Sequence, residues 1–373
     1  MRILMLNYEF PPLGGGAGNA TFYLLKEFAK LKNIEIDLIT SSAKGLFEHQ
    51  KFSENINIYK LNIGRRKNLH FQNNKDLLVY TFKAYLLGRR LSRQKKYDLT
   101  HAFFGVPCGL IGYLFKNKMP YIVSVRGSDA PGYNKRFAVL YKILTPLIKK
   151  IWKNSKAVIA NSEDLKNLAL KSAPNQEIKI IYNGVDTEEF KPSSRIEQEF
   201  TAISTSRLIE RKGIKYLIDA FIEFNKRHNN SRLLLIGSGN LEKELREKVR
   251  KVNIQNKIDF LGAINHSKIA GYYQQSDVFV LPSLNEGMSN SLLEAMASGL
   301  AIIATDTGGA KKLIDNTNGV IVKKQNANDI FGALEKLYLN KKLLDSMKST
   351  SRKKIKETSW KKIAGKYYQL YTV

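Results

Sequence analysis

Two acidic residues in the second half of the chain have the type and spacing to bind a hydroxyl-rich ligand. Glu286 and Glu294 have seven residues between them, and an ionised carboxylate can accept hydrogen bonds from two adjacent hydroxyl groups. The surrounding sequence predicts a strand that ends near Leu281, then a loop, and then a short helix from about Ser291 to Gly299. For Glu294 a structural alternative stays open, because Ser291 and Glu294 also fit the S-x-x-E capping box of a helix start.

Two groups of residues near the ends of predicted strands could bind an anion. The N–H groups of Ser289, Asn290 and Ser291 would point out of the helix start, where the helix dipole favours negative charge. Arg207 and Lys212 follow the first strand predicted in the second half of the chain. They could hold a pyrophosphate and stabilise negative charge as it leaves. A solvated basic loop is the alternative for these two cations.

Several glycine-rich turns also follow predicted strands. Such turns let backbone N–H groups approach a phosphate closely. The first contains Gly15 and Gly16 and precedes a helix, and later ones contain Gly237 and the pair Gly308-Gly309. None of them matches the GxGxxG dinucleotide fingerprint or a Walker loop. A plain turn without a ligand is the alternative for each.

The elements that must position these residues alternate between strand and helix. Short apolar runs separated by amphipathic stretches are typical of parallel βαβ units. The predicted strands lie at residues 3–6, 36–40, 56–61, 99–102, 121–125, 157–160, 178–181, 201–205, 232–236, 258–261, 278–281, 301–305 and 319–322. We therefore expect an α/β protein with two doubly wound domains.

A proline and paired serines at residues 190–194 indicate a linker between the two domains. This places the domains at residues 1–192 and 193–352. A helix with one apolar face is expected at about residues 353–373, and it could pack back on the first domain.

The composition excludes several other classes of protein. No window approaches about eighteen consecutive apolar residues, so no transmembrane helix is expected, and the apolar N-terminus is better explained as a strand than as a signal peptide. His228 and His266 lack the spacing of metal ligands. Cys108 is the only cysteine and cannot form an internal disulfide, which favours a reducing cytoplasm.

Positive charge is abundant and unevenly distributed. The chain has 61 Lys and Arg against 33 Asp and Glu, a net charge of +28. Residues 60–156 alone contain 21 basic and 3 acidic residues, a net charge of +18. Such a field attracts nucleic acid, acidic lipid or phosphorylated substrates, although a biased genome composition is an alternative for the total. Residues 82–96 and 136–156 mix large apolar side chains with Lys and Arg, as interfacial helices do.

In their order and spacing, the motifs resemble those of the retaining, nucleotide-sugar-dependent glycosyltransferases of family 4, also called group 1. The matching segments cover nearly the whole chain and are Phe10-Pro11-Pro12 with the first glycine loop, Asn183-Gly184-Val185-Asp186, Ser206-Arg207-Leu208 with Lys212-Gly213, Phe260-Leu261-Gly262, Pro282-Ser283, the Glu286/Glu294 pair and Gly308-Gly309. The resemblance implies the GT-B fold, in which two facing Rossmann-like domains flank a cleft. It also implies that the enzyme needs no metal held by a DxD motif and no cofactor.

The resemblance assigns a role to each matching polar residue. Glu294 would bind the ribose hydroxyls of the donor. Glu286 would contact the donor sugar, helped by N–H groups from Met288 to Asn290. Arg207 and Lys212 would neutralise the diphosphate as it departs.

Glycines complete the donor site that the resemblance implies. Gly15 and Gly16 would meet the diphosphate from the first domain, Gly237 would lie at a neighbouring strand end, and residues just after Gly262 would meet the base. The implied reaction retains anomeric configuration, because the acceptor attacks from the face that the nucleoside diphosphate leaves.

One segment of the first domain departs from the family pattern. Many members have a histidine where this chain has Arg126, and an arginine cannot act as a base near neutral pH. Asp129 becomes the candidate for contact with the acceptor, and His101 is a further candidate on the acceptor side.

Together these features predict a glycosyltransferase that uses a UDP- or GDP-sugar. Its expected acceptor is a lipid-linked saccharide in bacterial surface polysaccharide synthesis, such as that of O-antigen or capsule. The protein is expected in the cytoplasm, bound peripherally to the anionic inner face of the membrane, without a nucleic-acid partner. The alternatives are a sugar-nucleotide epimerase of the same fold and a basic nucleic-acid-binding protein.

Overall fold

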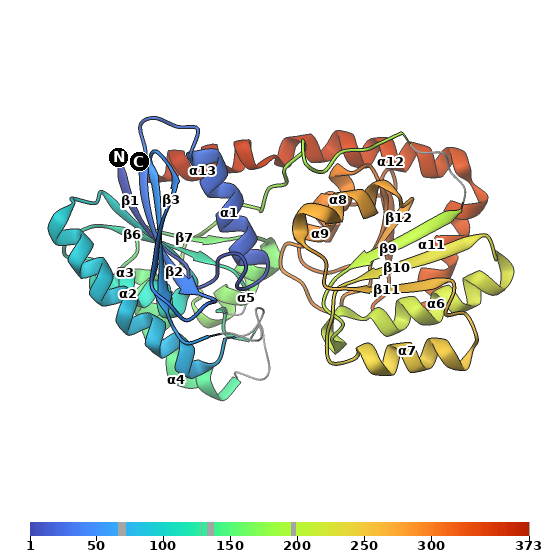
Figure 1. Ribbon diagram of the computed structural model, residues 1–373, viewed down its shortest axis with the longest axis horizontal. Coiled ribbons are helices and arrows are strands. Elements are labelled where there is room, and N and C mark those ends of the chain that lie inside the picture. The colour runs from blue at the N-terminus through green and yellow to red at the C-terminus, as the bar shows by residue number, and fades with distance from the viewer. Residues whose placement is uncertain (66–71, 128, 133–137, 195–198, 373) are drawn as a thin grey trace. The chain divides into compact units, whose positions relative to one another are not determined.

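The computed structural model describes residues 1–65, 72–127, 129–132, 138–194 and 199–372. The chain divides into two compact units (Figure 1). Unit 1 comprises Met1–Asn183 and Trp360–Val373, and unit 2 comprises Gly184–Ser359. Unit 1 is therefore discontinuous in sequence, whereas unit 2 is one continuous segment.

An eight-stranded sheet, called sheet 1 here, forms the centre of unit 1. Its order is β3-β4-β2-β1-β5-β6-β7-β8, and all neighbouring strands are parallel except β3 and β4. The strands are β1 (Arg2–Leu6), β2 (Glu35–Ser42), β3 (Glu48–Ser53), β4 (Ile56–Asn62), β5 (Leu99–Phe103), β6 (Tyr121–Val125), β7 (Ala157–Ala160) and β8 (Ile178–Ile180). The strand order reverses between β1 and β5, so their carboxyl ends form the switch point at which doubly wound sheets bind ligands.

Helices cover both faces of sheet 1. They are α1 (Gly16–Phe28), α2 (Asn74–Gln94), the π-helical η1 (Gly105–Gly109), α3 (Leu110–Leu114), α4 (Ala138–Lys153), α5 (Glu163–Ser172) and α13 (Trp360–Thr372). The helices α1 and α13 pack together, and the rings of Tyr23 and Trp360 stack with their centroids 5.9 Å apart. Trp360, Tyr367 and Tyr371 are buried in the same hydrophobic cluster as β1. The helix α13 therefore completes the core of unit 1.

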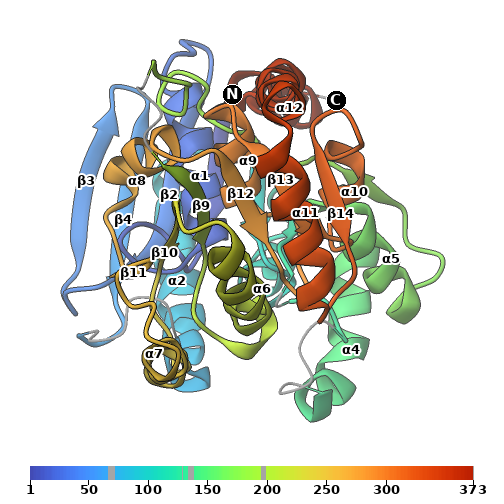
Figure 2. The ribbon, with the colours of Figure 1, turned by 90° about the vertical axis from the view of Figure 1, so that its right-hand side faces the viewer.

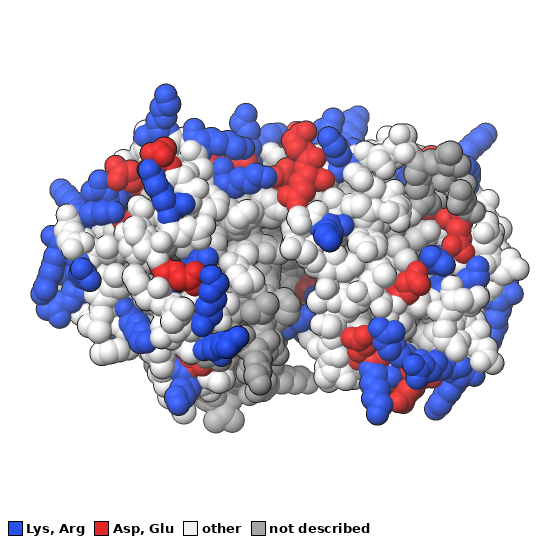
Figure 3. All heavy atoms as spheres, in the orientation of Figure 1, with Lys and Arg blue, Asp and Glu red and all other residues white. Residues whose placement is uncertain are grey.

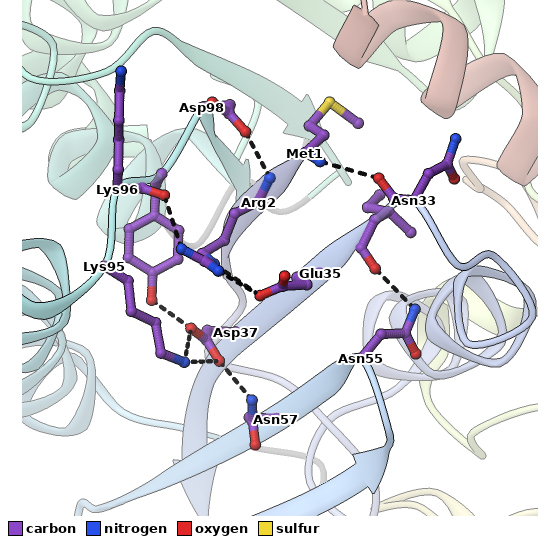
Figure 4. A network of polar contacts seen from close by, with 12 residues as sticks. Met1, Arg2, Asn33, Glu35, Asp37, Asn55, Asn57, Lys95, Lys96 and Asp98 are labelled. Carbon is purple, nitrogen blue, oxygen red and sulfur yellow. Dashed lines mark hydrogen bonds and ion pairs between the residues drawn. The ribbon is translucent and has the colours of Figure 1, made fainter.

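A polar network joins the amino ends of several strands of sheet 1 (Figure 4). The buried carboxylate of Asp37 accepts hydrogen bonds from Lys95 Nζ at 2.9 Å, from Tyr97 Oη at 2.5 Å and from Asn57 Nδ2 at 2.9 Å. Beside it, Arg2 Nε donates to Glu35 Oε2 at 2.9 Å. Because these contacts lie at the end of the sheet opposite its carboxyl edge, we assign the network to stability rather than to ligand binding.

A second sheet, sheet 2, forms the centre of unit 2 and is parallel throughout, in the order β11-β10-β9-β12-β13-β14. Its strands are β9 (Phe200–Thr205), β10 (Ser231–Ile236), β11 (Ile258–Gly262), β12 (Val278–Leu281), β13 (Ala301–Thr305) and β14 (Gly319–Val322). The strand order reverses between β9 and β12, and their carboxyl ends form the second switch point. The two doubly wound sheets confirm the predicted α/β class.

The helices of unit 2 are α6 (Ile214–Arg227), α7 (Glu242–Lys251), α8 (His266–Gln274), α9 (Asn290–Ala297), α10 (Ala310–Leu313), α11 (Ala327–Leu339) and α12 (Lys341–Ile355), with the short 3-10 helices η3 (Glu210–Lys212) and η4 (Lys356–Thr358). Figure 2 shows α6 and α11 side by side in front of sheet 2, and they are in direct contact. The residues that follow β9 and β12 are thus held by a well-packed framework.

The chain leaves unit 1 after Asn183, before the segment predicted as the linker. Residues 184–190 pack on unit 2, because the guanidinium of Arg352 donates to the carbonyl oxygens of Thr187 at 3.0 Å and of Phe190 at 2.9 Å. Phe190 is itself buried. These contacts explain why the division precedes the Pro and Ser residues that indicated a linker.

Candidate active site

The loop after β9 is held against the loop after β12 by a close backbone approach. Gly213 has a φ of +64°, and a Cβ atom there would lie 2.1 Å from the carbonyl oxygen of Pro282. Next to it, Leu284 N donates to Arg211 O at 2.8 Å. Only glycine fits such a contact. The two loops at the switch point of sheet 2 therefore form one unit.

This packing brings Lys212 and Glu286 together in a buried ion pair. Their side chains are only 14% and 9% exposed, and Ser283 Oγ donates to Glu286 Oε1 at 2.8 Å. Burial alone would raise the pKa of Glu286, but the adjacent Lys212 ammonium and Arg211 hold that pKa below its usual value. Glu286 is thus an ionised carboxylate. Arg207 lies near enough for its charge to help lower the pKa of Lys212, although burial of Lys212 is the largest cause.

The glycine pair after β13 contacts the loop that follows β12. Gly308 has a φ of +56°, and a Cβ atom there would lie 1.8 Å from the carbonyl oxygen of Gly287. Gly309 N donates to that oxygen at 3.2 Å, and Thr305 Oγ1 donates to Ser283 O at 2.5 Å. Gly308 and Gly309 therefore act through the loop that carries Glu286.

The structure shows that the capping-box alternative for Ser291 and Glu294 is wrong. Helix α9 begins at Asn290, and its cap is Ser289, whose Oγ accepts from Leu292 N at 3.4 Å. The cap position is set by where the chain turns into the helix, which is two residues before Ser291. The carboxylate of Glu294 therefore does not cap helix α9, and it binds other partners.

Two residues that sequence reasoning did not select hold the Glu294 carboxylate. His266 Nε2 lies 2.9 Å from Oε1, and Tyr273 Oη donates to Oε2 at 3.3 Å. Tyr273 Oη also shares a hydrogen bond of 2.5 Å with Thr205 Oγ1, at the end of β9. Both come from α8, which follows β11. The only signal for His266 in the sequence is its place just after Gly262.

The surroundings of His266 favour its charged form. Burial would lower its pKa, but the hydrogen bond and charge of Glu294, with Glu189 at 4.0 Å from Nδ1, raise the pKa above its usual value. A raised folded-state pKa contributes stability below the unfolded value of 6.5 and loses it as the pH rises through the folded value.

We therefore expect His266→Gln to destabilise unit 2 more at pH 6 than at pH 8.5. Urea unfolding of the variant and of the wild-type protein at the two pH values measures this difference. An equal loss of stability at both pH values would show that the charge on His266 does not contribute.

The glycines after β10 and β11 shape the neighbouring part of the same edge. Gly237 has a φ of +127°, and a Cβ atom there would lie 2.0 Å from Ser206 O. Gly237 N donates to Gly262 O at 2.7 Å. Around Gly262, with a φ of +67°, a Cβ atom would meet nothing within 4 Å. Gly237 thus has a packing role, whereas Gly262 borders open space.

In unit 1 the first glycine loop lies at the carboxyl end of β1. Gly15 and Gly16 are exposed at the start of α1, which has no side-chain cap. Glu9 Oε2 accepts from Gly15 N at 3.2 Å, and a Cβ atom on Gly15 would meet nothing within 4 Å. The backbone at the start of this helix is open to the surface.

The three candidates on the acceptor side differ in position. Asp129 is buried, and its carboxylate accepts from the N–H groups of Arg126 at 2.8 Å, Gly127 at 3.0 Å and Gly105 at 2.8 Å. Burial raises its pKa. Because its oxygens accept from backbone N–H groups of two loops, Asp129 has a structural role. Its contact with the acceptor stays a prediction.

His101 is fully buried inside unit 1. Its Nδ1 lies 2.7 Å from Tyr371 Oη and its Nε2 lies 2.8 Å from Ser124 Oγ. Burial and the charge of Arg126 lower its pKa well below the usual value. Neutral and enclosed, His101 lies in the core of unit 1, and its contact with an acceptor stays a prediction.

Arg126 is half-buried and joins several parts of unit 1. Its guanidinium lies over the ring of Phe103 at 4.7 Å and donates to Asn183 Oδ1 at 2.8 Å and to Tyr367 Oη at 3.3 Å. These three partners are uncharged, so the contacts leave the positive charge of Arg126 in place.

Two protein-family models match the two halves of the chain. The model for Glycosyltransferase Family 4 matches residues 14–189, and the model for Glycosyl transferases group 1 matches residues 185–354. The chain belongs to the group 1 glycosyltransferases of family 4. The two matches include every candidate residue described above for the two switch points.

This glycosyltransferase is similar to several individual proteins over most of its length. It is 28% identical over 367 residues to an uncharacterized glycosyltransferase of Methanocaldococcus jannaschii, across 97% of this chain and 95% of that protein. It is 26% identical over 291 residues, 74% of this chain and 76% of the other, to the N-acetylgalactosamine-N,N'-diacetylbacillosaminyl-diphospho-undecaprenol 4-alpha-N-acetylgalactosaminyltransferase of Campylobacter jejuni. Its structure matches sucrose-phosphate synthase of Thermosynechococcus elongatus with a TM-score of 0.83 and 21% identity, over 100% of this chain and 98% of that one. The last match confirms the GT-B fold.

Other features of this glycosyltransferase concern membranes, metals and its cysteine. In the described residues, no helix combines the length and apolar character needed to cross a bilayer. The same residues contain no group of three or more His, Cys, Asp or Glu side chains that could hold a metal ion. Cys108 is buried and forms no disulfide.

Proposed function

We propose that this glycosyltransferase moves a sugar from a nucleotide-sugar donor to a saccharide acceptor with retention of anomeric configuration. The observation that carries the proposal is the buried Lys212–Glu286 pair at the switch point of sheet 2. A positive and a negative group fixed side by side at this edge suit a ligand that offers both phosphates and hydroxyls. Arg207, which follows β9, and Glu294, on the helix after β12, add a second cation and a second carboxylate.

In the proposed reaction the nucleoside diphosphate leaves with the electron pair of the bond between its oxygen and the anomeric carbon of the sugar. That bond to the diphosphate oxygen breaks, and negative charge grows on the diphosphate, where Lys212 and Arg207 stabilise it. The acceptor oxygen bonds to the anomeric carbon on the same face. Its proton passes to a phosphate oxygen of the donor, so atoms and charge balance.

The two glutamates are proposed to hold the two ends of the donor. Glu286, kept ionised by Lys212, accepts hydrogen bonds from the sugar hydroxyls, with help from N–H groups at residues 288–290. Glu294 accepts from the ribose hydroxyls, and His266 and Tyr273 fix the orientation of its carboxylate. A preoriented carboxylate loses less freedom when the ligand binds.

Unit 1 is proposed to offer an anion-binding loop and residues that bind the acceptor. The exposed backbone at Gly15 and Gly16 suits an anion at the start of α1, and that anion would replace the Glu9 carboxylate as the acceptor from Gly15 N. Arg126 can donate hydrogen bonds but keeps its proton near neutral pH. We therefore assign it to binding and not to proton transfer.

The acceptor is proposed to be a lipid-linked saccharide of bacterial surface polysaccharide synthesis, reached from an anionic membrane surface. The net charge of +18 over residues 60–156 supports this. The Campylobacter jejuni relative also supports a lipid-linked acceptor, because the name of that enzyme includes a diphospho-undecaprenol-linked saccharide.

A panel of UDP- and GDP-sugars, offered with short lipid-linked saccharides, tests the proposed function. We expect nucleoside diphosphate release with one donor, and NMR should show the donor's anomeric configuration in the product. Conversion of the donor into its epimer without an acceptor would support the epimerase alternative instead. Absence of diphosphate release with every donor would contradict the proposal.

A further inference from the structure

The helix α2 presents apolar side chains on two opposite faces. Its inner face buries Tyr80, Ala84, Gly88 and Leu91 against unit 1. On its outer face, Leu78, Phe82 and Leu86 are 70%, 65% and 46% exposed. Side chains four positions apart lie in line on a helix. These three residues therefore form a continuous apolar line facing water, called the α2 stripe here.

Leu114, on the neighbouring helix α3, is a further exposed apolar residue. It is 53% exposed at the end of α3. The next residue, Phe115, stacks on Tyr85 of α2 with ring centroids 5.4 Å apart, so the two helices are in contact here. An exposed apolar side chain thus lies on a helix that contacts α2.

Within α2 itself, cations flank the α2 stripe and no exposed acid does. The exposed basic residues of α2 are Lys75, Lys83, Arg89, Arg90 and Arg93. The only acid in the helix is Asp76, which is buried and forms the capping box with Asn73. In Figure 3, Lys and Arg side chains gather at the left edge of the molecule, where Figure 1 shows the C-terminal part of α2.

We propose that the outer face of α2 lies flat on an anionic lipid bilayer, with Leu78, Phe82 and Leu86 inserted at the acyl boundary and the flanking cations at the lipid phosphates. An apolar line bordered by Lys and Arg is the pattern of an interfacial helix. Charge argues against a second copy of the chain as the occupant, because pairing two such faces would bring their cations together. The proposal rests on the membrane part of the proposed function and goes further, since it names the surface and adds apolar insertion to charge attraction.

Sedimentation with vesicles of phosphatidylcholine and phosphatidylglycerol tests the proposal. The triple variant Leu78→Ser, Phe82→Ser and Leu86→Ser should bind at least 10-fold more weakly than the wild-type protein. The control is Leu339→Ser, because Leu339 is 69% exposed but lies on α11 of unit 2; it should bind like the wild type. Salt should release the triple variant more readily, because screening weakens charge attraction but not apolar insertion.

A second variant reports insertion directly. The native Trp152 and Trp360 are both buried, so in Phe82→Trp the new side chain is the exposed indole. Brominated lipids should quench its fluorescence and leave the wild-type emission nearly unchanged.

The outcomes separate this proposal from the proposed function. Equal vesicle binding by the triple variant, or no quenching in Phe82→Trp, would overturn insertion of the α2 stripe while membrane binding by charge stands. A wild-type protein that ignores anionic vesicles at low salt would overturn both. Nucleoside diphosphate release by the triple variant with a soluble acceptor should equal that of the wild type, because no residue of the α2 stripe belongs to the candidate active site.

Discussion

Replacing Lys212 with alanine is expected to reduce sugar transfer by about 100-fold or more. Removal of a single preorganised donor to developing negative charge typically costs that much in kcat. Lys212 is enclosed beside Glu286, so water cannot easily take over its role. Nucleoside diphosphate release at saturating donor measures the effect. The control is Lys215→Ala, whose exposed pair with Glu210 should matter little.

The same substitution should also destabilise unit 2, because it leaves the Glu286 carboxylate buried without its ammonium partner. Breaking a buried pair in this way costs roughly 3 kcal/mol. The double variant Lys212→Met with Glu286→Gln should recover most of this stability and none of the activity. Recovery of activity together with stability would mean that the pair serves only the fold.

Replacing Glu294 with alanine is expected to weaken donor binding by about 100-fold. Each hydrogen bond to a charged group contributes about 1.5–3 kcal/mol, and a carboxylate can accept two from adjacent ribose hydroxyls. The loss should appear in the KM for the donor and in inhibition by the free nucleoside diphosphate. Isothermal titration with UDP and GDP measures the second quantity without any acceptor.

A matched control exists elsewhere in unit 2. Glu335 also pairs with a histidine, since His228 Nε2 lies 3.3 Å from its Oε1, but this pair joins α6 and α11 away from the carboxyl edge of sheet 2. Glu335→Ala should leave nucleotide affinity unchanged. Similar losses of affinity in the two variants would mean that Glu294 acts through stability and not through ribose contact.

Most of the strands could be predicted because they are short apolar runs between helical patterns. All strands of sheet 2 appear where the sequence indicated them. In sheet 1 the sequence did not indicate β3, whose residues Glu48–Ser53 are mostly polar, with none of them buried. An edge strand of this kind is held by backbone pairing to β4 and has no buried face to produce an apolar pattern.

The candidate site could be predicted only in part. Residues just after β9 and β12 could be selected because parallel strands of a doubly wound sheet place their ligand contacts at the carboxyl edge. The partners of Glu294 could not be predicted. His266 and Tyr273 lie on α8, after a different strand, and an isolated histidine forms no recognisable sequence pattern. The structure also shows contacts of Asp129 that the sequence did not predict. A lone acid in a basic stretch suggested a ligand contact, but its partners are backbone N–H groups that composition cannot reveal.

Unit 1 cannot be completed until residues far along the chain have been synthesised. Tyr23 and Phe28 of α1 pack on Trp360 and Tyr371 of α13, and the ribosome makes these partners only after the whole of unit 2. Domains generally fold as units during synthesis, so unit 2 can become native while α1 still exposes this apolar surface. A released chain that ends just before residue 360 would thus carry a complete second unit and an unfinished first one, open to chaperones along α1.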